Sequence, residues 1–366
     1  MTTVLPLRAL NRATLARQRL LARGTTLADV LAGVGGLQAQ APFPPFVGLW
    51  SRVADFASDH LRAALDARAV VRATLQRATL HVVTADDFVR FRAALQPVLT
   101  RAWMSASRGR AAAIDLEALV REAKARLRAG ACTAAALRDH LGALHPGLDP
   151  QVLSLAVRHE LPMVQTPGRG AWSFPASPAF ADAEAWLGRP LGGDRDLAPL
   201  LRRYLEAFGP ATVADFQTWS GVRGARPLFE GLRPELEVIR DEHGRELFDV
   251  EGAPRPDVDT PAPPRFVPDW DNLLLAHDDR TRIIPPEHRP TIFFSAQRVR
   301  ATVLVDGFAA AVWDIERSRD AVVLVVRPLA PMSGRARNDV ADEGARLLAF
   351  TDPGARTRDV RFDAAP

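Results

Sequence analysis

Two glutamines separated by a single alanine, Gln38 and Gln40, stand in a short stretch, residues 35–42, that opens with two glycines and ends with a proline. Each side-chain amide offers one carbonyl acceptor and two N–H donors, and neither amide titrates near neutral pH. The pair therefore cannot act as a conventional acid and base, but it can hold a water molecule against a polarised sugar or base. Chemistry at such a site needs a leaving group that requires little protonation. The alternative interpretation is ordinary polar residues at a helix end, and the pair alone leaves both open.

Composition sets the outer limits. A chain of 366 residues exceeds one typical core and predicts two to four modules. Its apolar runs stay below the roughly 18 residues that a membrane span requires, and its first residues lack the basic-then-apolar order of a signal peptide. The single cysteine, Cys132, excludes an internal disulfide framework and a thiolate metal cluster. We expect a cytoplasmic protein with no membrane partner.

Arginine dominates the basic residues. Lys124 is the only lysine among 47 basic residues, and the net charge is +4. Codon usage in a GC-rich genome explains this bias without any function, whereas phosphate recognition explains it through the bidentate binding of oxyanions by guanidinium. The scarcity of lysine also limits mechanism, because a Schiff-base reaction has only Lys124 and the terminal amine to use.

One pattern occurs three times along the first 250 residues: a group of helical segments followed by two β-prone segments. The β-prone segments are residues 70–75 with 78–83, residues 164–174 around a glycine turn, and residues 236–240 with 246–250. Helices followed by a hairpin are typical of a winged helix-turn-helix module, and three in series strengthen the interpretation.

The pattern changes after a proline-rich stretch, residues 254–268, that is typical of a linker. Short strands are predicted at residues 298–305, 309–315 and 321–326, and their even spacing favours a small barrel or antiparallel sheet. A helix at residues 340–350 is predicted to close the chain. The expected fold class is α+β.

Four segments of the chain resemble a known family. They are Leu-Gln-Ala-Gln at residues 37–40, Arg-Ala-Thr-Leu-His-Val-Val at 77–83, the stretch 208–221 around Phe-Gly-Pro-Ala-Thr, and Trp-Asp-Asn-Leu-Leu-Leu-Ala-His-Asp-Asp-Arg at 270–280. In this order they resemble the winged-helix DNA glycosylases of the AlkZ and YcaQ type, and Gln40 matches the glutamine version of the motif, where the other branch has aspartate.

The resemblance implies three tandem winged helix-turn-helix motifs followed by a C-terminal β-barrel, in a C-shaped molecule with a concave channel for duplex DNA. The expected divisions are residues 1–100 with the glutamine motif, 101–190, 191–260 and 261–366.

The resemblance also implies hydrolysis of the N-glycosidic bond of N7-alkylated purines and unhooking of interstrand crosslinks, in self-resistance to a DNA-alkylating natural product. Gln38 and Gln40 would then be catalytic and position the attacking water. A cationic base departs without being protonated, so neutral amides suit it. With lysine nearly absent, a monofunctional glycosylase without lyase activity is expected. The alternative is a non-catalytic winged-helix DNA-binding or regulatory protein.

Further residues are predicted to contact DNA, each with a plainer alternative. His81 lies in an apolar strand and is otherwise a structural histidine, and the stretch around Arg108 is otherwise a solvated connector. The full set of predicted DNA contacts is Arg77, His81, Arg108, Arg110, Arg280 and Arg282. No cofactor or metal is indicated, and we expect a monomer whose partner is double-stranded DNA.

Overall fold

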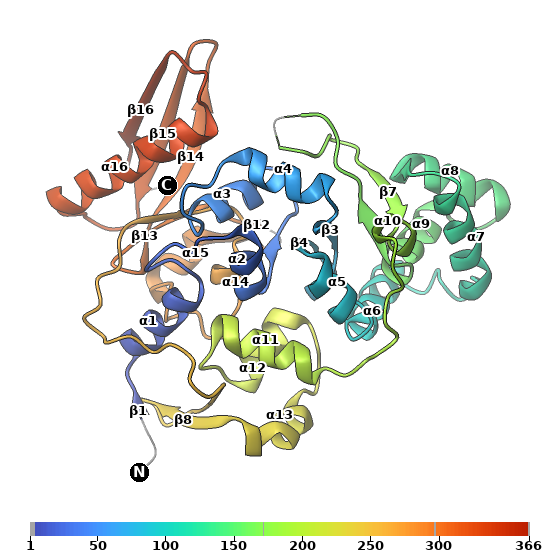
Figure 1. Ribbon diagram of the computed structural model, residues 1–366, viewed down its shortest axis with the longest axis horizontal. Coiled ribbons are helices and arrows are strands. Elements are labelled where there is room, and N and C mark those ends of the chain that lie inside the picture. The colour runs from blue at the N-terminus through green and yellow to red at the C-terminus, as the bar shows by residue number, and fades with distance from the viewer. Residues whose placement is uncertain (1–3, 171, 296–297, 365–366) are drawn as a thin grey trace.

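The chain folds into a mixed arrangement of helices and strands, as the α+β prediction required (Figure 1). The structure is a computed structural model, and it describes residues 4–170, 172–295 and 298–364. Three groups of elements follow one another along the chain, and a fourth group is built mainly of strands. The division at residues 100, 190 and 260 stays a prediction, because sheets cross two of these boundaries.

The first group carries the glutamine motif. Its elements are β1 (Val4–Leu5), α1 (Leu7–Arg17), α2 (Leu27–Gly33), β2 (Leu37–Gln38), α3 (Pro44–Trp50), α4 (Ser58–Asp66), β3 (Val70–Thr74), the 3-10 turn η1 (Gln76–Ala78), β4 (Leu80–Thr84) and α5 (Ala85–Phe91). The predicted hairpin is confirmed, since β3 and β4 pair antiparallel from Val70 opposite Thr84 to Thr74 opposite Leu80.

The second group extends the same sheet. Its elements are α6 (Gln96–Ser107), α7 (Leu116–Arg128), β5 (Cys132–Thr133), α8 (Ala134–Leu144), α9 (Pro150–Glu160), β6 (Met163–Gln165), β7 (Ala179–Asp182) and α10 (Ala183–Leu187). Strand β6 pairs with β3, so the sheet runs in the order β2-β4-β3-β6-β7-β5 through both groups. The predicted return strand within residues 164–174 is wrong: β6 pairs with the later β7.

The third group lies below the first in Figure 1. Its elements are α11 (Ala198–Phe208), α12 (Val213–Ser220), α13 (Arg226–Leu232), the 3-10 turn η2 (Arg233–Glu235), β8 (Glu237–Asp241) and β9 (Glu246–Asp249). The hairpin of β8 and β9 is confirmed, and β1 joins it in parallel. The N-terminal strand therefore pairs with residues more than 230 positions away.

The C-terminal group is a five-stranded sheet flanked by a long helix. Its elements are β10 (Arg265–Val267), α14 (Asn272–Leu275), η3 (Pro286–His288), α15 (Arg289–Ile292), β11 (Phe293–Ser295), β12 (Arg298–Val299), β13 (Thr302–Val305), β14 (Phe308–Arg317), β15 (Ala321–Pro328), α16 (Gly334–Thr351) and β16 (Thr357–Phe362). The sheet has the order β10-β13-β14-β15-β16, and closure into a barrel stays a prediction.

Two expectations for this region are wrong. The linker at residues 254–268 contains the buried strand β10, and the predicted last helix is followed by β16, which pairs in parallel with β15. Both strands are short or polar: β10 has three residues, and β16, Thr-Arg-Asp-Val-Arg-Phe, is mostly exposed. Neither carries the alternating apolar pattern from which strands are predicted.

Candidate functional site

Two glycines set the position of Gln38. Gly35 and Gly36 have φ angles of 72° and 81°, in the left-handed region that glycine enters at little cost. A Cβ atom at position 36 would lie 2.5 Å from Cγ1 of Val83 and 3.2 Å from the carbonyl oxygen of Val82. The chain therefore turns out of α2 and lays β2 directly against β4, which a larger residue at position 36 would prevent.

Gln38 lies on β2 and Gln40 lies in a bend two residues further on, so the alternative in which the pair ends a helix is wrong. Gln38 stands opposite His81 in the antiparallel pair of β2 and β4, and Ala39 N donates to the Leu80 carbonyl over 2.7 Å beyond the end of β2. Gln38 is buried with 7% exposure, whereas Gln40 is exposed. The backbone N–H of Leu80 donates to Oε1 of Gln40 over 3.0 Å, which fixes the amide of the exposed glutamine.

Arg77 holds the amide of the buried glutamine. Its Nη2 atom donates to Oε1 of Gln38 over 2.6 Å and to Oδ1 of Asn272 over 3.2 Å, and its Nη1 atom donates to the carbonyl of Trp219. All three acceptors are neutral oxygens, and within the described ranges no carboxylate forms an ion pair with this guanidinium. Burial lowers the pKa of Arg77 to about 10, and the positive charge of Arg280 adds to the effect.

The turn that carries Arg77 is itself strained. Arg77 and Ala78, in η1 between β3 and β4, have φ angles of 54° and 58°. Such angles cost of order 1–3 kcal/mol for a residue with a side chain and persist only where the surroundings hold them. Gly221, just after α12, packs against this turn, since a Cβ there would lie 3.3 Å from Cα of Arg77.

Asn272 reaches the site from the C-terminal group of elements. Its Nδ2 atom donates to the carbonyl of Gly36 over 3.0 Å, and its Oδ1 atom accepts from Arg77. The preceding residue, Asp271, caps α14 by accepting from the N–H of Leu273 and forms a bidentate pair with Arg52, with N···O distances of 2.7 and 2.9 Å. Both members of this pair are fully buried, so the bonds of Asp271 fix the segment that carries Asn272.

His81 lies behind the glutamines as a neutral side chain. It has no exposed surface, and its Nδ1 donates to the carbonyl of Thr79 over 3.0 Å. Burial, with the charge of Arg77, lowers the pKa of His81 to about 3. These features fit the structural alternative for His81, and its contact with DNA stays a prediction that this buried position does not favour.

The predicted DNA-contacting arginines separate into three environments. Arg280 lies at the site, with its guanidinium 4.5 Å from the ring centre of Phe293, and its charge is felt by Arg77. Arg282 is buried elsewhere and donates to the carbonyl of Pro210 over 2.9 Å. Arg108 and Arg110 are exposed just after α6, where Arg110 pairs with Asp149. Arg77 is therefore bonded to Gln38 and Arg280 lies near Arg77, and contact with DNA stays a prediction for all of them.

The sequence interpretation missed two residues that build the site. Asn272 belongs to a segment quoted for the family resemblance, yet no role was assigned to it. Arg72, on β3, donates through Nε and Nη2 to the carbonyl of Ala39, at 2.9 and 2.6 Å, and so fixes the backbone between the two glutamines. An arginine in the middle of an apolar strand was the available signal for Arg72.

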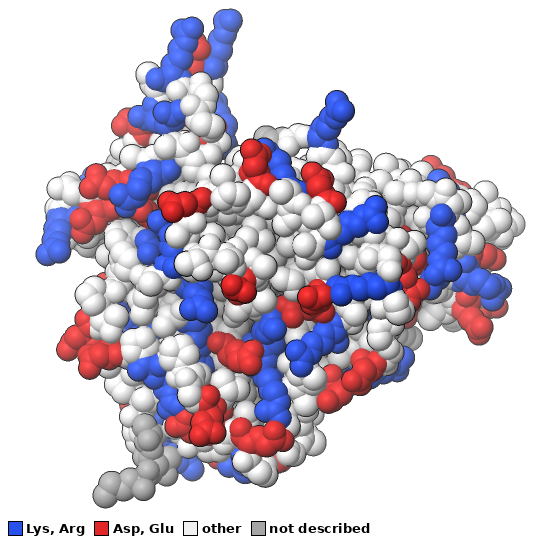
Figure 2. Space-filling view, in the orientation of Figure 1, with Lys and Arg blue, Asp and Glu red and all other residues white. Residues whose placement is uncertain are grey.

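The side-chain amides of Gln38 and Gln40 keep several hydrogen-bonding groups available to a ligand. Each Oε1 already accepts one bond from the protein, and within the described ranges neither Nε2 has a protein partner. An amide oxygen has a second lone pair. The site therefore presents two NH₂ groups and two partly used carbonyl oxygens. Figure 2 shows basic and acidic side chains interspersed over one face of the molecule.

Across the described ranges, no group of three or more histidine, cysteine, aspartate or glutamate side chains is placed to hold a metal ion. Among the helices of the same ranges, none has the length and apolar character needed to cross a membrane.

With this fold and this site, the chain belongs to the AlkZ-like DNA glycosylase family, whose model matches residues 31–350. It is 29% identical over 160 residues to the interstrand DNA cross-link repair glycosylase of Streptomyces sahachiroi, and the matched region covers 41% of this chain and 42% of that protein. The solved structure of the Streptomyces sahachiroi DNA glycosylase AlkZ superimposes with a TM-score of 0.79 at 21% identity, covering 99% of this chain and 100% of that one. The predicted family is thus confirmed, and the overall fold is that of AlkZ.

Proposed function

We propose that this protein is a monofunctional DNA glycosylase that hydrolyses the N-glycosidic bond of N7-alkylated purines in duplex DNA. The observation that carries the proposal is the hydrogen bond from Arg77 to Oε1 of Gln38, which leaves the Nε2 group of a buried glutamine as a directed donor. A cationic N7-alkylpurine is the substrate that such a neutral site suits, because its glycosidic bond breaks without a proton being supplied.

Gln38 acts on the departing base. When the C1′–N9 bond breaks, its electron pair stays on the purine, neutralises the positive ring and raises electron density at N3. A donated N–H at that position stabilises the developing charge more than it stabilises the substrate, which is the requirement for rate enhancement. Arg77 strengthens this donor by polarising the amide from its oxygen end.

Gln40 acts on the water. Its Oε1 accepts from Leu80 N and keeps one lone pair, which accepts an O–H of a water molecule and turns the water oxygen towards C1′. The water oxygen bonds to C1′ of the oxocarbenium ion, and the proton passes to solvent. The products are the free alkylpurine and an abasic site. Positioning of this kind contributes several kcal/mol to the rate.

The placement of lysine supports a reaction without a lyase step. Lys124 lies on α7, and its Nζ is ion-paired with Glu184 of α10 at 2.8 Å. Within the described ranges this is the one lysine amine, and an ion-paired amine is a poor nucleophile for a Schiff base with the sugar.

Interstrand crosslinks joined through two N7 atoms are proposed as the physiological substrate. The relative named for interstrand cross-link repair supports this extension, and each end of such a crosslink carries the same cationic purine as a simple N7 adduct. Protection of a producer of DNA-alkylating metabolites follows as the proposed biological role.

The test is a glycosylase assay on duplex DNA carrying one N7-methylguanine, and on a duplex crosslinked through N7. We expect abasic product from both, and loss of product in Gln38→Ala and Gln40→Ala. If neither duplex yields abasic product, the protein is a non-catalytic DNA-binding protein instead. If both variants retain full activity, the site lies elsewhere.

A further inference from the structure

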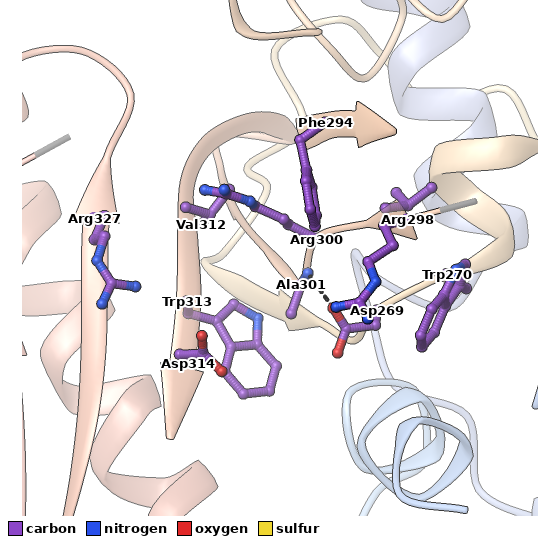
Figure 3. Close-up of a pocket in the computed structure, with 11 residues that line it drawn as sticks. Asp269, Trp270, Phe294, Arg298, Arg300, Ala301, Val312, Trp313, Asp314 and Arg327 are labelled. Carbon is purple, nitrogen blue, oxygen red and sulfur yellow. Dashed lines mark hydrogen bonds between the residues drawn. The ribbon is translucent and has the colours of Figure 1, made fainter. Parts of the chain in front are cut away.

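A pocket of about 490 Å³ lies between the hairpin of β11 and β12 and the C-terminal sheet (Figure 3). Its walls come from the loop before α14, the hairpin, the two residues between β12 and β13, β14 and β15. Its charged and aromatic lining includes Asp269, Phe294, Arg298, Arg300, Trp313 and Arg327, with Asp314 as a second carboxylate. The volume lies within the range of about 300–1000 Å³ that ligand sites occupy.

Within the described ranges, the three arginines of this pocket form no close ion pair, although Arg298 is near enough to Asp269 for its charge to act on the pKa of that carboxyl. The side chains of Arg298, Arg300 and Arg327 form neither an ion pair nor a hydrogen bond within the described ranges. Elsewhere the arginines of this protein are widely paired, as Arg52 with Asp271 and Arg17 with Asp249 illustrate. Three unpaired guanidiniums around one cavity form a site for an anion with several oxygens, of which a phosphodiester is the natural example.

Asp269 adds an acceptor to the same cavity. Its Oδ1 accepts from the N–H of Ala301 over 3.0 Å, whereas Oδ2 has no partner in the described ranges. Burial, with the nearby charge of Asp314, raises the pKa of Asp269. A carboxylate beside three arginines does not help to hold a phosphate, so this oxygen points to a ligand that also carries N–H donors.

Aromatic side chains are the third feature of the pocket. Phe294 is 48% exposed and is the one aromatic residue among the exposed large hydrophobic residues of the described ranges. The guanidinium of Arg300 lies 4.6 Å from its ring centre, and Trp313 forms part of the floor. An exposed ring flanked by arginine is a platform on which a nucleobase stacks.

We propose that this pocket binds one extrahelical nucleotide of the DNA, with its phosphates on the three arginines, its base on Phe294 and its N–H edge towards Asp269. Guanine is the preferred base, because its N1–H and N2–H donors lie side by side and match a carboxylate. The proposal rests on the proposed action on DNA.

The position of the pocket relative to the glutamines supports the same occupant. Asn272 accepts a hydrogen bond from Arg77. Asp269 lies three residues before Asn272, so the Cα atoms of Asp269 and Asn272 are at most about 11 Å apart. A nucleotide held at Asp269 is therefore a near neighbour of the nucleotide at Gln38.

The experiment measures binding by fluorescence anisotropy and needs no adduct. The probes are three labelled duplexes of equal length: fully paired, with one bulged guanine, and with one bulged thymine. We expect the wild-type protein to bind the guanine bulge about tenfold more tightly than the paired duplex. Arg300→Ala should remove most of this gain, and Asp269→Asn, which keeps the acceptor for Ala301 N, should equalise guanine and thymine.

Arg335→Ala is the control, because Arg335 is exposed on α16 and only loosely paired with Asp339 at 3.9 Å. It should leave all three affinities unchanged. Equal binding of bulged and paired duplexes by the wild-type protein overturns the pocket assignment while leaving the glycosylase proposal intact. Saturation by free dGMP at micromolar concentration without any bulge preference overturns DNA as the source of the nucleotide. Loss of excision activity with normal bulge preference contradicts the glycosylase proposal alone.

Discussion

The Nη2 atom of Arg77 donates to Oε1 of Gln38 over 2.6 Å, and this bond decides which end of the amide faces the substrate. Guanidinium groups have donors only, so the oxygen of Gln38 must point towards Arg77. The nitrogen then points away from it. The sequence predicted that Gln38 helps to position the attacking water; that role stays a prediction, and the bond to Arg77 makes the free nitrogen the group that we propose acts on the base.

Replacing Gln38 by glutamate tests whether this side chain acts as a hydrogen-bond donor or as a hydrogen-bond acceptor. Gln38→Glu keeps the shape and the bond to Arg77 but has no N–H to offer. We expect its single-turnover rate on N7-methylguanine to fall about 10²-fold, the usual cost of losing one donor at a transition state. Gln38→Ala should fall similarly, with melting temperatures reported for both variants. A glutamate variant that retains the wild-type rate would show that Gln38 works as an acceptor.

The same replacement at Gln40 should have the opposite outcome. Gln40→Glu keeps an oxygen for the N–H of Leu80 and adds a negative charge near the oxocarbenium ion. We expect the excision rate for N7-methylguanine to be maintained or to rise, and slow excision of a neutral base such as uracil to become detectable. The wild-type protein should show no uracil excision. Gln40→Ala, which removes the oxygen without adding charge, is the matched comparison; it should lose activity on N7-methylguanine and show none on uracil.

Replacing Arg77 should lower the excision rate, whereas replacing Arg108 should weaken DNA binding. Arg77→Lys supplies one charge but cannot reach Gln38, Asn272 and the Trp219 carbonyl together. Its rate at saturating enzyme should fall about 10-fold or more, with little change in affinity for DNA. Arg108 is exposed and without an ion pair in the described ranges, so Arg108→Ala should weaken DNA binding and leave the saturated rate unchanged. If Arg77→Lys changes only the affinity, its role is contact with DNA.

Local patterns predicted much of the fold. The hairpin of β3 and β4 and that of β8 and β9 follow from β-prone segments separated by a short turn, and the register of each is set within a few residues. The strands that were not predicted, β10 and β16, differ from these hairpins. β10 and β16 acquire their strand structure from partners far along the chain, so their own residues carry little signal.

The site was predicted only in part for a similar reason. Gln38 and Gln40 are separated by one residue and belong to a recognisable motif. The orientation of Gln38 depends on Arg77, 39 residues away, which also bonds to Asn272, 195 residues beyond that. No pattern within one segment specifies such a contact. The positive φ of Arg77 and the close approach of Gly221 are likewise consequences of packing between separate groups of elements.

The buried histidines make stability depend on pH in a defined direction. His81 and His277 have pKa values lowered to about 3, and burial also lowers the pKa of His159. In the unfolded chain each would titrate near 6.5. As the pH falls from about 6.5 towards 3, the unfolded state binds protons that the folded state does not, so the free energy of unfolding decreases.

His81→Asn tests this contribution. Above about pH 7 both states are neutral at this position, so the variant should show no pH-dependent difference from the wild-type protein. Between pH 6.5 and 5, where most carboxylates of the unfolded chain remain ionised, its loss of stability with acidification should be shallower by up to about 1.4 kcal/mol per pH unit. Urea unfolding at pH 7.5, 6.5, 5.5 and 5 provides the measurement. Equal slopes for the two proteins would mean that His81 is protonated in the folded state, and a charged His81 beside Arg77 would contradict the neutral site on which the mechanism depends.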